Sequence, residues 1–334
     1  MISNKADNID GCVVITGGTG SFGQSFTRYL LANTDAKIRI ISRDEAKQEQ
    51  MQREFSDSRL TFILCDVRDF RKLISAIDGA TIIVHAAALK RVSTGERQAD
   101  EFTKTNVNGT ANVIDSALLA GMPRTMFVSS DKAVQPFNAY GKSKALAESL
   151  VIQANARGAR RHVRFAVVRG GNVWGSRGSV IDVWRELVRT QKPITISNRS
   201  VTRFHLPMEA WCAFVWRSII EMRGGEIFIP KLRAWKLGDL VSAFIRAHAN
   251  EAGEPYPYSV IGALDGDKLH EMLIAPSEIC RTVETDWCYL IEPPGAICDV
   301  WEYVPHEGRP LLDGFEYTSE RASRMMPSDL LELL

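Results

Sequence analysis

A glycine-rich turn near the start of the chain, TGGTGSFG, limits the fold more than any other feature. It follows an apolar run at residues 12–15 and precedes an amphipathic run through Phe26, Leu30 and Leu31. A continuous apolar run is typical of a parallel strand buried on both faces. The glycines let the backbone turn tightly and approach a pyrophosphate, and the next helix offers free N–H groups. The stretch therefore predicts a strand–turn–helix unit that binds a dinucleotide.

Strand and helix keep alternating through the first half of the chain. Predicted strands follow at residues 38–41, 60–64, 82–84, 125–129 and 163–168. Predicted helices lie at residues 45–55, 102–119 and 140–157. Five or six strands that alternate with helices indicate a doubly wound parallel sheet of the α/β class, which is Rossmann-like.

The pattern loosens after residue 169. The stretch 170–180, GGNVWGSRGSV, is predicted as a loop whose Asn172, Ser176, Arg177 and Ser179 could hold a substrate diphosphate, or as a tight connection between domains. Further helices are expected at residues 180–190, 208–222 and 236–249, with a short strand at 226–229. We expect residues 1–169 to form the cofactor-binding Rossmann domain. Residues 170–334 should form a smaller mixed α/β substrate-binding part, with some segments returning to the main sheet.

Composition argues against several classes of function. The chain has 334 residues, a formal net charge of +1 and scattered lysines and arginines, which disfavours nucleic acid or a membrane as partner. The six cysteines form no Cys-x-x-Cys pair, so we expect free thiols, a reducing cytoplasmic setting and no metal site. The start, MISNKADNID, is polar and unlike a secretory signal. The longest apolar stretch, residues 81–89, is shorter than the roughly 20 residues of a spanning helix.

The ends of the predicted strands suggest which cofactor binds. After the second strand, Ser42 and Arg43 stand where an NAD enzyme places an acid, and they suit the 2′-phosphate of NADP. Asp44 could compete for this role or cap the next helix. Asp66, after the third strand, could accept a hydrogen bond from adenine or cap a helix. Three alanines after the fourth strand would let a cofactor lie against the backbone, and His85 before them is predicted to be a satisfied core histidine.

The stretch 129–144, SSDKAVQPFNAYGKSK, carries two acid–base pairs. Tyr140 and Lys144 are four residues apart and share one face of a helix, and an ammonium near a phenol would make Tyr140 a usable base. Asp131 and Lys132 follow the predicted fifth strand, where a carboxyl group and an amine can act as acid and base. A solvated helix start and a surface turn would explain the same residues. The nucleotide-binding first half favours the catalytic interpretation.

These motifs together resemble the extended short-chain dehydrogenase/reductase superfamily. Within it the chain is similar to the C5-inverting UDP-N-acetylglucosamine 4,6-dehydratase family of surface-sugar pathways. The resemblance is carried by TGGTGSFG, SRDEAKQ, DVRD, HAAALKRV, KTNVNGTANVI, SSDKA, YGKSK, GNVWGSRGSV, TRF, GGEIFIPK, DKLHE and FEYTS. The glycine motif and Tyr-x-x-x-Lys are shared by the superfamily, whereas the others together are more specific. Membrane-anchored relatives that retain the C5 configuration have long N-terminal spans, which this sequence does not show.

The resemblance implies a role for each residue of the two pairs. Tyr140 would take the proton of the sugar 4-hydroxyl while hydride passes from C4 to the nicotinamide, and Lys144 would lower the tyrosine pKa and hold the nicotinamide ribose. Lys132 would take the C5 proton, and a protonated Asp131 would give its proton to the departing 6-hydroxyl. Ser130 would hydrogen-bond the reacting sugar. NADP would end as it began, so it need not exchange.

The resemblance also implies residues for the two binding sites. The cofactor-binding set, besides Tyr140 and Lys144, is Thr16, Gly17, Gly20, Ser21, Phe22, Gly23, Ser42, Arg43, Lys47, Asp66, Val67, Ala86, Ala87, Ala88 and Asn106. The substrate-binding set is Lys90, Asn172, Ser176, Arg177, Ser179, Val180, Thr202, Arg203 and Glu271. The expected substrate is a UDP-sugar.

The sequence departs from the family pattern in five places. Ser130 stands where the family has threonine and keeps the hydroxyl, and Gly170 stands where it has a tyrosine. Leu264 replaces an arginine expected near the nucleotide diphosphate, Ser93 replaces a proline, and an asparagine is missing near Arg321. The acid–base residues are unchanged, so these departures concern the identity of the sugar and of the nucleotide.

Two other functions remain open at this stage. An NADP-dependent 4-epimerase or 4-ketoreductase of nucleotide sugars would use Tyr140 and Lys144 but has no task for Asp131 and Lys132. A non-catalytic NADP-binding regulator usually lacks the tyrosine or the lysine, and this chain has both. Because relatives associate and the polar helix at residues 45–55 has few obvious intrachain partners, we also expect a homo-oligomer.

Overall fold

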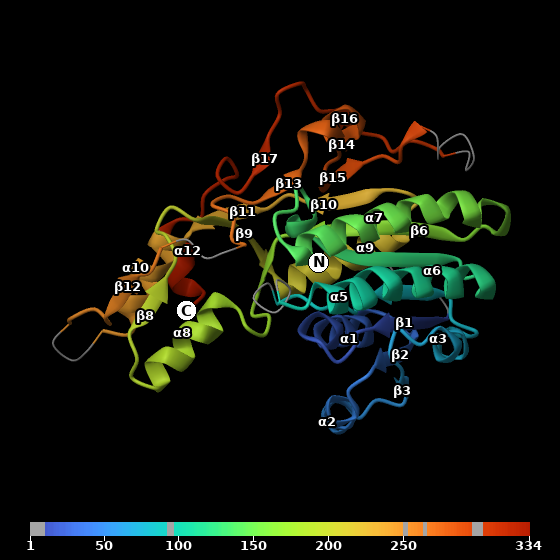
Figure 1. Cartoon of the computed structure of the whole chain (residues 1–334), viewed down its shortest axis with the longest axis horizontal. Helices are drawn as coiled ribbons and strands as arrows, with labels where there is room; N and C mark the ends of the chain where they lie inside the picture. The colour runs from blue at the N-terminus through green and yellow to red at the C-terminus, as the bar shows by residue number, and fades with distance from the viewer. Residues whose placement is uncertain (1–10, 92–96, 250–252, 263–265, 296–302) are drawn as a thin grey trace.

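The computed structural model describes residues 11–334 except 92–96, 250–252, 263–265 and 296–302. Its centre is a ten-stranded sheet in the order β16-β14-β15-β10-β6-β5-β4-β1-β2-β3 (Figure 1). The parallel strands are β1 (Cys12–Thr16), β2 (Lys37–Ser42), β3 (Leu60–Leu64), β4 (Ile82–His85), β5 (Arg124–Ser130), β6 (Arg164–Gly170) and β10 (Ile227–Pro230). Antiparallel pairing adds β14 (Thr282–Glu284), β15 (Cys288–Ile291) and β16 (Arg309–Pro310). The predicted doubly wound α/β sheet is confirmed.

Helices cover both faces of the sheet and bury separate hydrophobic clusters. One face packs against α1 (Ser21–Asn33), α9 (Met208–Glu221) and α2 (Glu45–Phe55). The other face packs against α3 (Phe70–Ile77), α6 (Gly109–Ala120) and α7 (Ala139–Gly158). Val14 belongs to the second cluster and its neighbours Val13 and Ile15 to the first, because successive strand side chains point to opposite faces. Burial on both faces explains the continuous apolar run of β1.

The helix predicted at residues 102–119 is not uniform. It consists of α5 (Ala99–Phe102), a π-helical stretch η1 (Thr103–Asn108) and α6. A π-turn is rare inside an α-helix and often lies at a functional site. Here it carries Asn106, whose side chain bonds both the N–H and the carbonyl of Leu89, at 2.8 and 2.9 Å. The sequence pattern predicted a uniform helix here. The π-helical stretch instead coincides with the contacts between Asn106 and the loop after β4.

The other elements beyond residue 170 form a smaller group beside the sheet. A three-stranded sheet contains β7 (Asn172–Trp174), β9 (Thr202–Pro207) and β11 (Arg233–Lys236). The helices α8 (Val180–Arg189), α10 (Leu237–Ala247) and α12 (Pro327–Glu332) surround a third cluster that includes Trp184 and Phe244. Two further ribbons pair β8 (Ile194–Ile196) with β12 (Tyr258–Val260), and β13 (Met272–Ile274) with β17 (Tyr317–Thr318). The stretch 170–180 was predicted as a loop, but its residues 172–174 form strand β7, which pairs with β9.

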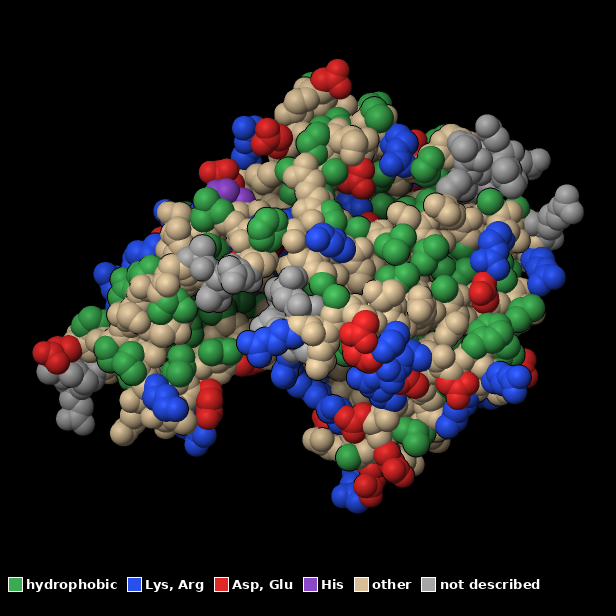
Figure 2. Space-filling view, viewed as in Figure 1, with side chains coloured by type: hydrophobic (Ala, Val, Ile, Leu, Met, Phe, Trp, Pro, Cys, Tyr) green, Lys and Arg blue, Asp and Glu red, His purple; other side chains and the backbone are tan. Residues whose placement is uncertain are grey.

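Three short 3-10 helices complete the described elements: η2 (Asp131–Ala133), η3 (Ala159–Arg161) and η4 (Pro276–Arg281). Among the described residues no helix is both long enough and apolar enough to cross a membrane. The described cysteines, which are Cys12, Cys65, Cys212, Cys280 and Cys288, are all free thiols. Figure 2 shows basic and acidic side chains interspersed over the face in view.

Candidate active site

A cleft of about 590 Å³ lies at the carboxyl ends of the parallel strands, where sheets of this class bind ligands. The glycine-rich turn, the ends of β2 to β6 and the stretch from 170 to 177 form its walls. Its lining includes these residues predicted to bind the cofactor: Gly17, Gly20, Ser21, Phe22, Gly23, Ser42, Arg43, Lys47, Asp66, Val67, Ala86, Ala87 and Ala88. It also includes Ser130, Lys132, Tyr140 and Lys144 from the catalytic set, and Lys90, Asn172, Ser176 and Arg177 from the substrate set.

The glycine-rich turn has the close packing that a pyrophosphate site requires. Gly17 has a φ of 68°, and a Cβ there would lie 2.8 Å from the backbone of Ala87. A Cβ on Gly23 would lie 2.5 Å from the backbone of Gly18, so only glycine fits. Gly20 is the N-cap of α1 and makes no side-chain cap bond. The first N–H groups of α1 are therefore available to an anion at the wall of the cleft.

The end of β2 carries one carboxylate that caps a helix and one accessible guanidinium. Asp44 caps α2 by accepting a hydrogen bond from the Lys47 N–H at 3.1 Å, and its carboxylate also pairs with the Lys47 side chain. Hydrogen bonds from Lys47 lower the pKa of Asp44. The proposed alternative for Asp44, a helix cap, is thus confirmed. The Arg43 side chain is 50% exposed and lies 3.6 Å from Asp66, which leaves its guanidinium accessible to an anion.

Asp66 does not cap a helix, because Asp69 caps α3 instead. Asp66 accepts hydrogen bonds from the backbone and the guanidinium of Arg68, at 3.0 and 2.7 Å. Burial alone would raise the pKa of Asp66, but the bonds from Arg68 lower it overall. The carboxylate is therefore ionised at neutral pH and stands at the wall of the cleft.

Thr16 and Asn106 were predicted to bind the cofactor but do not line the cleft. Thr16 and Thr110 bond the two ring nitrogens of His85, at 2.6 and 3.0 Å. Since Thr110 already donates to the Asn106 carbonyl, it accepts from His85 Nε2, and Nδ1 accepts from Thr16. Burial lowers the pKa of His85 to about 3. The predicted core histidine is confirmed. Thr16 and Asn106 do not face the cleft but hydrogen-bond the backbone of the loop after β4.

The first acid–base pair does not yet have the protonation expected of it. Lys144 Nζ donates to the Val128 carbonyl at 2.6 Å and lies 3.8 Å from the centre of the Phe127 ring. Burial lowers the pKa of Lys144 to about 7 and raises the pKa of Tyr140 to about 12. Burial is the largest cause of the raised Tyr140 pKa, and the cation that opposes it is Lys132 rather than Lys144. A cation near Tyr140 would lower the pKa of the phenol, and an anion near Lys144 would raise the pKa of the amine.

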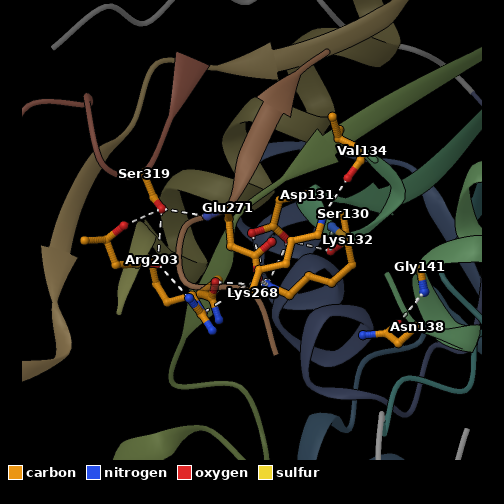
Figure 3. Close-up of polar contacts among 12 residues, drawn as sticks. Ser130, Asp131, Lys132, Val134, Asn138, Gly141, Arg203, Lys268, Glu271 and Ser319 are labelled. Atoms are coloured by element: carbon orange, nitrogen blue, oxygen red, sulfur yellow. Dashed lines mark hydrogen bonds and ion pairs between the residues drawn. The ribbon is translucent and has the colours of Figure 1, made fainter. Parts of the chain in front are cut away.

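The side chains of the second pair are in direct contact (Figure 3). Asp131 is fully buried in η2, and its carboxylate accepts a hydrogen bond from Ser130 Oγ at 2.8 Å. Lys132 Nζ lies 3.0 Å from Asp131 and 3.1 Å from Glu271. Burial raises the pKa of Asp131; it would lower that of Lys132, but Asp131 and Glu271 raise it overall. Both groups of the pair therefore have a raised pKa, so each binds its proton more strongly than it would in water.

Five residues of the predicted substrate set lie outside the cleft lining. Ser179 caps α8 by accepting from the Asp182 N–H at 3.3 Å, and Val180 packs on the third cluster. Thr202 bonds His270 and Ser319. Arg203 and Glu271 are within 3.7 Å of each other, and Glu271 reaches the cleft through Lys132. Leu264 and Ser93 lie outside the described residues.

Sequence reasoning missed two cleft residues of α9 and a lysine that contacts the backbone just after η2. Met208 and Trp211 line the cleft, although the amphipathic pattern of their helix gave no sign of it. Lys268 Nζ donates to the Val134 carbonyl at 2.6 Å. Its position within the motif Asp-Lys-Leu-His-Glu was the available signal. Among the described residues no group of acidic, histidine or cysteine side chains could hold a metal ion.

Comparison with known proteins gives matches that cover most of the chain. A family model described as polysaccharide biosynthesis protein matches residues 13–293. A UDP-N-acetylglucosamine 4,6-dehydratase (inverting) of Campylobacter jejuni is 36% identical over 92% of each chain. A UDP-glucose 4-epimerase of Rickettsia prowazekii is 35% identical over 98% of this chain and 96% of its own. The X-ray structure of Pen from Bacillus thuringiensis matches with a TM-score of 0.89 and 30% identity, covering 97% of this chain and 96% of that one.

Proposed function

The chain belongs to the family of polysaccharide biosynthesis proteins, and from this premise we propose that it is a nucleotide-sugar 4,6-dehydratase. The proposed substrate is UDP-N-acetylglucosamine, and the product is a UDP-4-keto-6-deoxy-L-hexosamine for surface glycans. One observation carries the proposal: Asp131 and Lys132 form a second acid–base pair near the Tyr140–Lys144 helix. Oxidation at C4 needs one base, whereas loss of water across C5 and C6 also needs an acid and a base there. The name of the Campylobacter jejuni relatives agrees with this assignment.

We infer that the cofactor is NADP, held mainly by residues 1–169, with the sugar nucleotide held mainly by residues 170–334. Bound nicotinamide would supply the hydride acceptor and return the hydride, so that no net oxidation occurs. The glycine-rich turn and the open start of α1 suit its pyrophosphate. Arg43 and Lys47 suit a 2′-phosphate, since the Asp44 carboxylate is engaged as a helix cap.

The protein supplies the proton acceptor for the 4-hydroxyl through Tyr140. This side chain begins as a phenol and Lys144 begins partly neutral. A cation near Tyr140 stabilises the phenolate, and an anion near Lys144 stabilises the ammonium. Ligands that bring both charges into the cleft would therefore activate the pair. The 4-ketone formed in this way acidifies the hydrogen at C5.

Elimination can use the Asp131–Lys132 pair in its uncharged form. One proton moving from the Lys132 ammonium to the Asp131 carboxylate, 3.0 Å away, gives a neutral amine and a carboxylic acid. The amine then takes the C5 proton, and the acid gives its proton to the leaving 6-hydroxyl as water. Both groups are left as the ion pair from which they started. Burial favours the uncharged Asp131 carboxyl group, whereas Asp131 and Glu271 favour the Lys132 ammonium, so the proton transfer has to work against this attraction.

Mass spectrometry after incubation with UDP-N-acetylglucosamine tests the proposal directly. The expected product has lost the mass of one water. In deuterium oxide, NMR should find solvent deuterium at C5 and an L-configuration from the vicinal couplings. Deuterium at C5 with the original configuration would leave the dehydratase but disprove inversion. A substrate recovered without loss of water would disprove the dehydratase.

A 4-epimerase is the second candidate, because the Rickettsia relatives carry that name at 32–35% identity over 98% of this chain. An epimerase would convert UDP-glucose to its C4 epimer with no change of mass. It would also keep its activity in Asp131→Asn, because C4 chemistry needs only Tyr140 and Lys144. Loss of all activity in that variant therefore favours the dehydratase.

We further propose that the protein acts in the cytoplasm as a homo-oligomer with no nucleic acid or membrane partner. The free thiols at the described cysteines suit a reducing compartment. The interspersed charges suit neither nucleic acid nor an anionic surface.

A further inference from the structure

The segment 266–271 reaches across from the second half of the chain to the stretch that carries both acid–base pairs (Figure 3). Asn138 Nδ2 donates to the Gly266 carbonyl at 2.9 Å, and its Oδ1 accepts from the Gly141 N–H at 2.8 Å. Lys268 Nζ donates to the Val134 carbonyl at 2.6 Å. These contacts fix the segment beside η2 and the start of α7.

At the end of this segment the backbone of Glu271 is held on both sides by one buried residue. The Glu271 N–H donates to Ser319 Oγ at 2.9 Å, and the Ser319 N–H donates to the Glu271 carbonyl at 2.8 Å. Ser319 is fully buried, and Glu271 is 2% exposed. The backbone at Glu271 is therefore fixed, and its side chain is buried.

The carboxylate itself is directed at Lys132. Its Oε1 lies 3.1 Å from Lys132 Nζ and 3.7 Å from Arg203 Nε. Its Oε2 is buried and has no hydrogen-bond partner among the described residues. A buried carboxylate oxygen without a hydrogen bond costs stability. A purely structural residue at this place would gain from a better-paired side chain, so the arrangement indicates a functional requirement.

We propose that Glu271 is a positioning residue for the dehydration step, which holds the Lys132 amine against Asp131 and sets the charge of that pair. The inference rests on the proposed function. Lys132 has a long flexible side chain and a third neighbour, Asn172 Oδ1, at 3.2 Å. Without Glu271 the amine would be free to turn toward Asn172, away from the geometry needed for proton exchange with Asp131.

The sign of the electrostatic effect follows from the groups that face one another. Lys132, Arg203 and Lys268 face Glu271, while Glu271 and Lys132 face the Asp131 carboxylate. Tyr140, from α7, also faces the Asp131–Lys132 pair. Removing a negative charge lowers the pKa of every neighbouring group, because anionic forms lose a repulsion and cationic forms lose an attraction. Loss of the Glu271 charge should thus shift both Asp131 and Lys132 to lower pKa.

The test compares Glu271→Gln, which keeps the shape, with Glu271→Asp, which keeps the charge. In Glu271→Gln we expect kcat to fall about 10²-fold, as for a misplaced catalytic group, with KM for the UDP-sugar changed far less. Both limbs of the kcat–pH profile should move to lower pH. Glu271→Asp should keep the wild-type limbs. Glu320→Gln is a matched control, since Glu320 is 59% exposed and lies beside His270.

A kcat–pH profile of Glu271→Gln that coincides with the wild-type profile would overturn the proposal, whatever its effect on stability. A second measurement does not need turnover. With lysine labelled at Nζ by nitrogen-15, the Lys132 resonance, assigned through Lys132→Arg, should titrate at lower pH in Glu271→Gln than in the wild type. An unchanged midpoint in a protein that dehydrates its substrate would refute the role of Glu271 alone. Failure of the wild type to dehydrate would refute the proposed function, and the midpoint would still report whether Glu271 sets the charge of Lys132.

Discussion

Replacing Arg169 by methionine should destabilise the protein by about 3–5 kcal/mol, the range for breaking a buried ion pair from one side. Arg169, on β6, uses every guanidinium N–H. It donates twice to Glu148 of α7, at 3.2 and 2.6 Å, and twice to Glu278 of η4, at 2.9 and 3.0 Å. The fifth bond goes to the Leu273 carbonyl at 2.8 Å. Methionine fills similar space but leaves two carboxylates unpaired in the interior.

The pH dependence of this loss can be worked out from the carboxylates. In the wild type, burial alone would raise the pKa of Glu278, but Arg169 lowers it overall. A carboxyl group with a lowered folded pKa contributes stability above its unfolded pKa and loses it as pH falls through the folded value. In Arg169→Met the Glu278 carboxyl group, without its cation, should instead have a raised folded pKa, so that protonation relieves it. The deficit of the variant should therefore be largest above neutral pH and shrink toward pH 5.

Urea unfolding at two pH values measures the effect, with the midpoint and slope giving the free energy of unfolding. The control is the triple variant Arg169→Met, Glu148→Met, Glu278→Met, which removes the charges together. Replacing a whole buried ionic cluster by apolar groups is often near neutral, so the triple variant should lose less stability than the single one. A triple variant less stable than Arg169→Met would refute the explanation by uncompensated charge. A loss below about 1 kcal/mol in the single variant would refute the magnitude.

Three further predictions concern the site and the assembly. Arg43→Ala should weaken the binding of NADP relative to NAD by about 1.5–3 kcal/mol, the value of a charge-assisted contact. An unchanged NADP/NAD affinity ratio in a binding titration would disprove the 2′-phosphate site. Lys132→Ala should lose roughly 10²–10⁴-fold in dehydration while Tyr140 still supports C4 oxidation, so that bound reduced cofactor accumulates and absorbs in the near ultraviolet; undiminished turnover would remove the role given to this lysine. Light scattering at working concentration should give a multiple of the 37.2 kDa chain mass, and a monomer mass would contradict the homo-oligomer.

The sequence predicts the parts of the site that depend on neighbours along the chain. The apolar runs at residues 12–15, 38–41 and 60–64 became β1, β2 and β3 with at most one added residue at either end. Buried parallel strands have a continuous apolar signature. Asp131 and Lys132 are adjacent in the chain, and their side chains meet at 3.0 Å. Local proximity of this kind requires no knowledge of the fold.

The parts that depend on contacts between distant segments could not be predicted. The residues of β7 have no strong strand pattern and form a strand because β9 lies beside them. Glu271 reaches Lys132 across more than a hundred residues of chain. The pKa of Tyr140 follows burial, which a spacing rule for tyrosine and lysine does not contain. In each case the deciding term is a tertiary environment that the sequence specifies only through the complete fold.

The departure from the family pattern at Gly170 also cannot be interpreted without the tertiary structure. The family pattern has a tyrosine at this place, so the glycine looks like the loss of one wall of the cleft. A Cβ at Gly170 would lie 3.0 Å from the Trp211 ring and 3.1 Å from Leu206, so no larger side chain fits there unless its neighbours move. Trp211 is 2% exposed and lines the same cleft from α9. The space beside Gly170 is thus already filled by an aromatic ring from another element, and the departure exchanges one contribution to the wall for another.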